Sequence, residues 1–132
     1  MNDDLIQQAI RARDNARAQF SGFSVGAALA TSEGRIYRGC NVENASYGLT
    51  VCAERVALLS AIADGAGEFT EIAVATQSEV PSTPCGPCRQ LMWEYCGDIP
   101  VHLVSTTTGQ RKTFQLSALF PEPFELSPED TI

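Results

Sequence analysis

The sequence predicts an α/β fold in which a mixed, mostly five-stranded sheet lies between two layers of helices. Helical periodicity and short apolar strand patterns follow one another in the order α-β-β-α-β-α-β-β-α. Helices that alternate with strands in this way cover both faces of one sheet. No repeat, low-complexity tract or linker divides the 132 residues, so we expect one domain, residues 1–132.

The first half of the chain contains a helix, a hairpin and a second helix. Apolar residues recur at helical spacing after Asn2, which can cap the first helix. A Ser-Glu-Gly-Arg turn at residues 32–35 joins two alternating segments, and Gly65 stops the second helix. We therefore expect helices at residues 3–16 and 53–63, the latter with Val56, Leu59 and Ala63 on one face, and strands at residues 23–29 and 36–40.

The second half continues the alternation of strands and helices. Pro87 fits the first turn of a helix, where its missing N–H costs nothing, and Gly97 fits the end of the same helix. The predicted elements are a strand at residues 72–76, a loop at 77–84, a helix at 86–96, strands at 101–105 and around 113–115, and a short helix near 117–120.

Charge and cysteine content narrow the class of protein. Nine basic residues against sixteen acidic ones give a net charge of -7, which disfavours binding to nucleic acid or to an anionic membrane surface. The start, Met1–Asp4, is acidic and polar and does not resemble a secretory signal. Five cysteines, three of them at metal-ligand spacing, favour a reducing environment. We therefore expect a cytoplasmic protein.

Two cysteine clusters contain the candidate metal ligands. Cys52-Ala53-Glu54 is followed, after a long gap, by Pro84-Cys85-Gly86-Pro87-Cys88. Both clusters fall at predicted helix starts, where free N–H groups and the helix dipole favour thiolates. The thiolates of Cys52, Cys85 and Cys88 suit Zn²⁺ and leave a fourth coordination position for water. Buried core thiols or a redox Cys-x-x-Cys pair are the alternatives, but neither explains a third cysteine with a glutamate beside it.

Glu54 and Arg55 follow the first ligand directly. A carboxylate beside a metal-ligand cysteine can move protons to and from water, so we interpret Glu54 as the general acid and base. Without the neighbouring cysteine, Glu54 would be interpreted as a solvent-exposed residue whose negative charge interacts favourably with the helix dipole. Arg55 could be a surface residue, but three thiolates and one Zn²⁺ leave a net charge of about -1. A guanidinium that donates to ligand sulfurs would offset this charge.

Cys40, Cys96 and His102 lie outside this pattern. Cys96 comes two turns after Cys88 on the same predicted helix, and His102 is the only histidine, so we interpret all three as structural. A different class stays open, namely a binding protein with a closed, purely structural zinc site. Such a site has four protein ligands, and one of these three residues would have to complete it.

At these motifs the chain resembles the cytidine deaminases of the short, homotetrameric, three-cysteine type, and the resemblance covers nearly its whole length. It includes Phe23–Leu29, the Gly-Cys-Asn-Val-Glu-Asn-Ala run at residues 39–45, both cysteine clusters and Leu119–Phe124. It implies a cytidine deaminase-like fold, one Zn²⁺ per chain, a homotetramer with active sites near the subunit interfaces, and hydrolytic deamination of a nucleoside. Pro87 departs from the family pattern, which often has a small residue between the paired cysteines.

The resemblance also implies which residues bind the substrate. Asn41 and Glu43 would hydrogen-bond the ribose 3′-hydroxyl, although the same residues could form only a polar turn. Phe23 and Ala53 would line the nucleoside pocket, and Phe124 would reach the pyrimidine bound by a neighbouring subunit. Either phenylalanine could instead be plain core. Tyr47 is similar to a family tyrosine near the subunit contacts.

An acidic chain with sugar-recognising residues favours a neutral nucleoside, cytidine or deoxycytidine, over a polynucleotide or free cytosine. The products would be uridine or deoxyuridine and ammonia, a reaction of pyrimidine salvage. The alternative within the same chemistry is another cytosine-containing compound, such as a blasticidin-type antibiotic.

Overall fold

The computed structural model describes residues 2–126. Its centre is a five-stranded mixed sheet with the strand order β2-β1-β3-β4-β5, in which only the β3–β4 pair is parallel. The strands are β1 (Val25–Thr31), β2 (Ile36–Cys40), β3 (Phe69–Thr76), β4 (Pro100–Ser105) and β5 (Arg111–Gln115). The helices are α1 (Asp3–Arg13), η1 (Tyr47–Leu49), α2 (Ala53–Ala63), α3 (Gly86–Cys96) and α4 (Leu116–Leu119).

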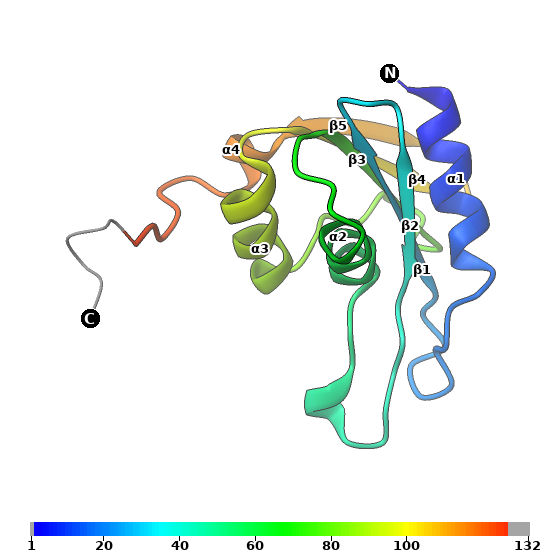
Figure 1. Ribbon diagram of the computed structural model, residues 1–132. Helices are drawn as coiled ribbons and strands as arrows, with labels where there is room; N and C mark the ends of the chain where they lie inside the picture. Colours follow the sequence, from blue (N-terminus) through cyan, green and yellow to red (C-terminus); the bar gives the residue numbers. More distant parts are fainter. Residues whose placement is uncertain (1, 127–132) are drawn as a thin grey trace.

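Helices cover both faces of the sheet (Figure 1). Helix α1 packs on one face over a small core that contains Leu5 and Ile6, while α2 and α3 pack on the other face over a larger core that contains Leu58 and Met92. The Asn2 side chain caps α1 by accepting the Leu5 N–H at 3.1 Å. The predicted three-layer α/β/α architecture is confirmed.

The topology gathers several element ends at one edge of the sheet. Val25 at the start of β1 lies opposite Thr76 at the end of β3, and Thr76 lies opposite Ser105 at the end of β4. Helix α2 begins beside β2, because its first turn rests on Gly39. Ligands of α/β proteins bind at the carboxyl ends of parallel strands, so this edge is where a site is expected.

Some element boundaries differ from the sequence-based expectation. Helix α1 ends at Arg13, so Ala16 lies beyond it, although its spacing continues the helical pattern. Strand β1 begins at Val25, because the Phe23 backbone is bonded to the side chains of Ser21 and Asn41. Strand β3 starts earlier than expected, at Phe69, and the short helix η1 was not predicted. On α2, Leu59 and Ala63 of the apolar face described above are exposed.

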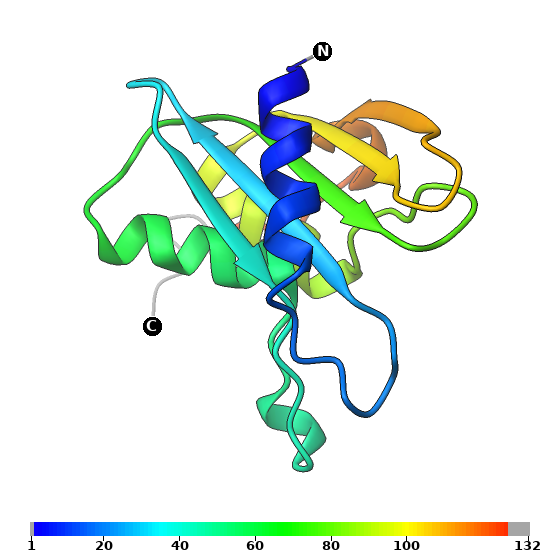
Figure 2. The ribbon, with the colours of Figure 1, turned by 90° about the vertical axis from the view of Figure 1, so that its right-hand side faces the viewer.

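The segment between β2 and α2 extends away from the sheet as an arm that carries η1 (Figures 1 and 2). A bridge between Val42 and Val51 closes its base. Its apolar side chains Tyr47 and Leu49 are 80% and 66% exposed. Within residues 2–126, none of the helices has the length and apolar character needed to cross a membrane.

Gly39 allows α2 to rest directly on the sheet, and we expect Gly39→Ala to destabilise the protein. A Cβ at this position would lie 2.3 Å from the Ala53 carbonyl oxygen and 2.5 Å from the Ala57 nitrogen, so the helix would have to move. Overpacking of this kind costs roughly 3 kcal/mol. Gly67→Ala is the matched control, because a Cβ there meets no atom within 4 Å. Urea denaturation measures both, and equal midpoints for the two variants would contradict the prediction.

Candidate functional site

A cavity of about 300 Å³ opens at this edge of the sheet, between β1, β3 and the first turn of α2. Its lining includes seven of the residues singled out from the sequence, and further lining comes from the loop that leads to α3. The seven are Phe23, Asn41, Glu43, Cys52, Ala53, Glu54 and Cys85. The fold therefore collects in one hollow residues that are more than sixty positions apart in the sequence.

Three thiols converge at the cavity wall. The Sγ atoms of Cys52, Cys85 and Cys88 all lie within 4.8 Å of one another, and the separations are 3.9 Å for Cys52–Cys85 and 3.2 Å for Cys85–Cys88. Tetrahedral Zn–S bonds of about 2.3 Å would set the sulfurs roughly 3.8 Å apart. The donor set and its spacing therefore fit a zinc ion.

Two of the three thiols lie at helix starts, where free N–H groups and the helix dipole favour negative charge. Cys52 is the N-cap residue of α2 and Cys85 that of α3, and neither side chain caps its helix by a hydrogen bond. Pro87 lies in the first turn of α3, as expected. The pKa of Cys52 is lowered, first by a hydrogen bond from the Cys88 thiol and then by the Arg55 guanidinium. The same hydrogen bond, together with burial, raises the pKa of Cys88, so zinc binding would have to release the Cys88 proton.

Glu54 is buried against this cluster, with only 5% of its surface exposed. Burial raises the pKa of its carboxyl group, and negative charge on Cys52 raises it further. A carboxyl group with a raised pKa can hold a proton and release it near neutral pH. Glu54 is therefore equipped to exchange protons with a molecule in the cavity.

Arg55 supports the cluster from the side. Its Nη2 donates to the Thr50 carbonyl oxygen at 3.2 Å and to Cys52 Sγ at 3.6 Å. The same thiol raises the pKa of the guanidinium, so the pair carries opposite charges. A positive charge at this distance offsets part of the negative charge of the three thiolates.

Asn41 and Glu43 tether the strand and loop beside the cavity. The Asn41 side chain accepts the Val25 N–H at 2.9 Å and donates to the Phe23 carbonyl oxygen at 2.8 Å. The Glu43 carboxylate accepts the N–H groups of Phe20 and Ser21 at 3.0 Å, and also the Ser21 hydroxyl. The Ser21 hydroxyl bond holds the pKa of Glu43 below its ordinary value. Both residues therefore hold the local backbone, as the polar-turn alternative predicts, and they also line the cavity.

Phe124 lies outside this cavity. It is 68% exposed and lines a separate small hollow with Trp93. Its backbone carbonyl accepts the side-chain amide of Gln90 at 3.1 Å, which ties the C-terminal segment to α3. In a single chain Phe124 therefore does not meet the other predicted substrate-binding residues.

Cys40, Cys96 and His102 do not join the thiol cluster. Both His102 ring nitrogens are engaged, Nε2 with Glu71 at 2.7 Å and Nδ1 with the Thr113 hydroxyl at 2.9 Å. Burial raises the pKa of Cys96 to about 12, which keeps it an inert thiol. Within the part of the chain that the structure describes, no fourth protein ligand closes the site, which disfavours a purely structural metal.

Arg89 is a residue at the site that the sequence reasoning did not single out. Its guanidinium donates to the Pro84 carbonyl oxygen at 2.7 Å, to the Thr83 hydroxyl at 2.9 Å and to the Leu119 carbonyl oxygen. Arg89 thus ties the loop before Cys85 to α4 and fixes the approach to the second cysteine cluster. Its position directly after Cys88 was the one available signal.

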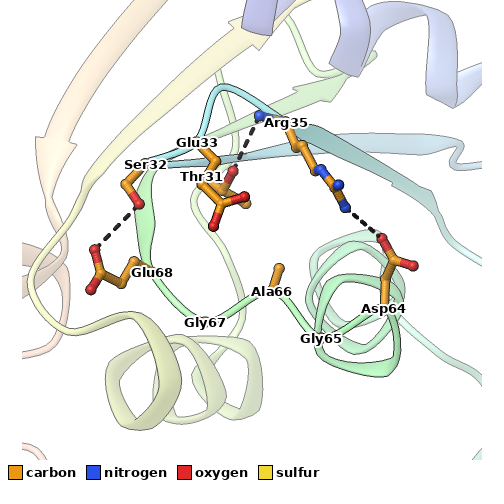
Figure 3. A pocket seen from close by; sticks show the side chains of 9 residues that line it. All are labelled: Thr31, Ser32, Glu33, Arg35, Asp64, Gly65, Ala66, Gly67 and Glu68. Carbon is orange, nitrogen blue, oxygen red and sulfur yellow. Dashed lines mark hydrogen bonds and ion pairs between the residues drawn. The ribbon is translucent and has the colours of Figure 1, made fainter.

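A second hollow, of about 330 Å³, lies at the opposite end of the sheet (Figure 3). Four of its polar side chains are paired with one another, Arg35 with Asp64 at 3.3 Å and Ser32 with Glu68 at 3.3 Å (Figure 3). None of the predicted site residues lines it. The first cavity, and not this second hollow, is therefore the candidate functional site.

A cluster of three thiols beside a buried carboxyl group with a raised pKa, at the carboxyl ends of parallel strands, defines the class of protein as a zinc-dependent hydrolase. Comparisons with known proteins narrow this class. Residues 1–102 match the family described as "Cytidine and deoxycytidylate deaminase zinc-binding region". The chain belongs to this family.

Individual relatives agree with this assignment. The chain is 42% identical to a cytidine deaminase of Sporosarcina psychrophila over 97% of its own length and 93% of the relative's. It is 46% identical to a cytidine deaminase of Halalkalibacterium halodurans over 91% of each chain. The crystal structure of cytidine deaminase from Burkholderia pseudomallei superposes with a TM-score of 0.90 at 46% identity, covering 94% of this chain and 100% of that one. A cytidine deaminase-like fold with one Zn²⁺ per chain follows.

The contacts of Arg89 predict that Arg89→Lys weakens zinc retention. A lysine cannot hold three acceptors in the planar arrangement of a guanidinium, so the loop before Cys85 loosens. Loss of such supporting contacts lowers metal affinity by roughly 10- to 100-fold. Competition with a chromogenic chelator measures the affinity. Arg38→Lys, at an exposed position on β2, is the control, and equal zinc affinity in both variants would refute the role of Arg89.

Proposed function

We propose that the protein catalyses the hydrolytic deamination of cytidine and deoxycytidine to uridine and deoxyuridine, with release of ammonia, as one catalytic domain acting in the cytoplasm in pyrimidine salvage. The observation that carries the proposal is the buried carboxyl group of Glu54 beside the three thiols, in a cavity that also contains Asn41 and Glu43. The family membership and the named activity of the relatives support it.

Cys52, Cys85 and Cys88 would hold the zinc ion, which as a Lewis acid lowers the pKa of water so that it can attack near neutral pH. Glu54 then performs the proton transfers. It takes a proton from the attacking water and delivers it to N3 of the ring, which makes C4 electrophilic. It next carries the second proton to the departing amino group, so that the C4–N bond breaks and ammonia leaves.

The raised pKa of Glu54 suits this shuttle. Glu54 must first accept a proton from water, and a carboxylate with an ordinary pKa is a weak base for that step. Burial raises its pKa, so it can accept the proton and pass it on to N3 near neutral pH. Arg55 would keep the thiolate cluster from becoming too negative to polarise water. The burial of Glu54 therefore sets the pKa of the proton carrier, and Arg55 separately sets the charge around the metal site.

Recognition of the sugar would fall to Asn41 and Glu43. One N–H of the Asn41 amide is used by Phe23, and the other has no partner within residues 2–126, so it can donate to a hydroxyl group. Glu43 is held as an anion, and a carboxylate has more acceptor sites than the three that Phe20 and Ser21 use. Polar groups placed to bind a sugar, of which Asn41 is buried, penalise a ligand that lacks the sugar, which favours a nucleoside over free cytosine. Phe23 and Ala53 would contact the base.

Glu54→Gln should bind zinc but lose roughly 10²- to 10⁴-fold in turnover, because an amide cannot carry the proton. The measurement is the absorbance change of cytidine on conversion to uridine, with zinc content determined on the same sample. Glu94→Gln, at an exposed position on α3, is the control and should turn over normally. Near-normal turnover by zinc-loaded Glu54→Gln would exclude Glu54 as the proton carrier. A wild-type protein that binds zinc but leaves cytidine unchanged would contradict the proposed substrate and favour another cytosine-containing compound.

We further propose a homotetramer in which Phe124 completes the active site of a neighbouring subunit. Two features support it. Phe124 is exposed and remote from the cavity of its own chain, and the arm that carries Tyr47 and Leu49 extends apolar side chains into solvent. Exposed apolar groups that extend together from a fold are typical of protein–protein contacts. The expected mass is about four times the 14.2 kDa of one chain.

Mixing two impaired variants tests the shared site. Phe124→Ala should be impaired, and so should Glu54→Gln, but after subunit exchange some sites contain Glu54 from one chain and Phe124 from the other. Activity should therefore rise above the sum of the separate samples, while light scattering reports the mass. Leu126→Ala, exposed in the same segment, is the control and should need no rescue. If the mixture is shown to exchange subunits but its activity only equals the sum of the two separate activities, Phe124 does not contribute to the neighbouring site.

A further inference from the structure

The Thr76 side chain is a buried polar group at the cavity that the proposed reaction does not use. Thr76 is the last residue of β3, lines the cavity together with Glu54 and Val74, and is only 3% exposed. Its hydroxyl oxygen has no hydrogen-bond partner among the residues that the structure describes. Most buried polar groups in proteins are paired, and an unpaired one at a binding cavity calls for a partner.

Neighbouring hydroxyl groups at the same end of the sheet are paired with protein atoms. The Thr106 and Thr107 hydroxyls donate to the carbonyl oxygens of Thr76 and Gln77, at 3.2 Å and 2.7 Å. The Ser105 oxygen accepts the N–H groups of Thr107 and Thr108, at 3.2 Å and 3.1 Å. The unpaired state of Thr76 is therefore a local exception, because the surrounding turn satisfies its own hydroxyls.

The backbone around Thr76 is fixed on both sides. Thr76 lies opposite Val25 on β1 and opposite Ser105 on β4, and its carbonyl oxygen also accepts the Thr106 N–H at 2.8 Å. Side chains alternate along a strand, so Thr76 shares the face of Val74, which also lines the cavity. The backbone therefore holds the Thr76 side chain at the cavity wall, where a bound molecule would supply the missing partner.

We propose that the Thr76 hydroxyl forms a hydrogen bond with the pyrimidine nucleoside bound in this cavity. Thr76 is then a binding residue that strengthens the binding of substrate and of product alike, whereas Glu54 transfers the protons. An interaction of equal strength in the ground state and the transition state changes KM and leaves kcat nearly unchanged. The inference rests on the nucleoside substrate proposed above.

Two substitutions separate the hydroxyl group from the shape of the side chain. Thr76→Val keeps the branched shape and removes the hydroxyl, and Thr76→Ser keeps the hydroxyl and removes the methyl group. If the free protein leaves this hydroxyl unpaired, its replacement by a methyl group is neutral or stabilising. A hydroxyl that held the fold together would give the opposite result, so the melting temperature distinguishes the two roles.

The experiment measures cytidine turnover, the Kd of the product uridine by calorimetry, and the melting temperature of each zinc-loaded protein. For Thr76→Val we expect KM and the uridine Kd to rise by roughly five- to fiftyfold, with kcat within about twofold and no fall in melting temperature. Thr76→Ser should restore most of the affinity.

Several results would overturn the proposal. Unchanged KM and Kd in Thr76→Val, or an equal loss in Thr76→Ser, would show that the hydroxyl does not bind the nucleoside. A lower melting temperature with normal affinity would assign the hydroxyl to the fold. Failure of the proposed function is distinguishable, because wild-type protein would then neither deaminate cytidine nor bind uridine.

Discussion

The close contact between α2 and the sheet at Gly39 is the constraint on which the site depends. A side chain at this position would collide with the backbone of Ala53 and Ala57, so the first turn of α2 lies directly on the strand. Gly26 allows the same approach by α1 on the opposite face, where a Cβ would lie 2.0 Å from the Ala9 carbonyl oxygen. The depth at which α2 begins sets how far Glu54 is buried and where Cys52 meets the second cysteine cluster.

Burial and charge act together at this position. Three thiols and a carboxyl group in one small volume would repel one another if all were ionised. The structure relieves the repulsion in two ways, because Arg55 approaches Cys52 and burial favours the protonated form of Glu54. A zinc ion would remove most of the remaining excess of negative charge. The concentration of negative charge and the burial of Glu54 therefore suit this part of the molecule to metal binding and proton transfer.

Residues in and near the cavity stabilise the local backbone in addition to their proposed functions. Asn41 fixes the start of β1, Glu43 fixes the loop before it, and Arg89 fixes the loop before Cys85. A substitution at any of them therefore changes the shape of the cavity as well as its chemistry. The most informative variants are conservative ones, which keep the tether and alter one group.

The sequence by itself determined the order of the elements, the three-layer fold and the two cysteine clusters with their adjacent glutamate. These are local or spacing signals, since periodicity, helix starts and ligand spacing can be read without knowing which segments meet. Only the tertiary structure decided that Thr76 ends unpaired at the cavity, that Arg89 ties its loop to α4 and that Phe124 lies away from its own site. The physical reason is that pairing and burial depend on contacts between residues distant in the chain, which no local pattern encodes.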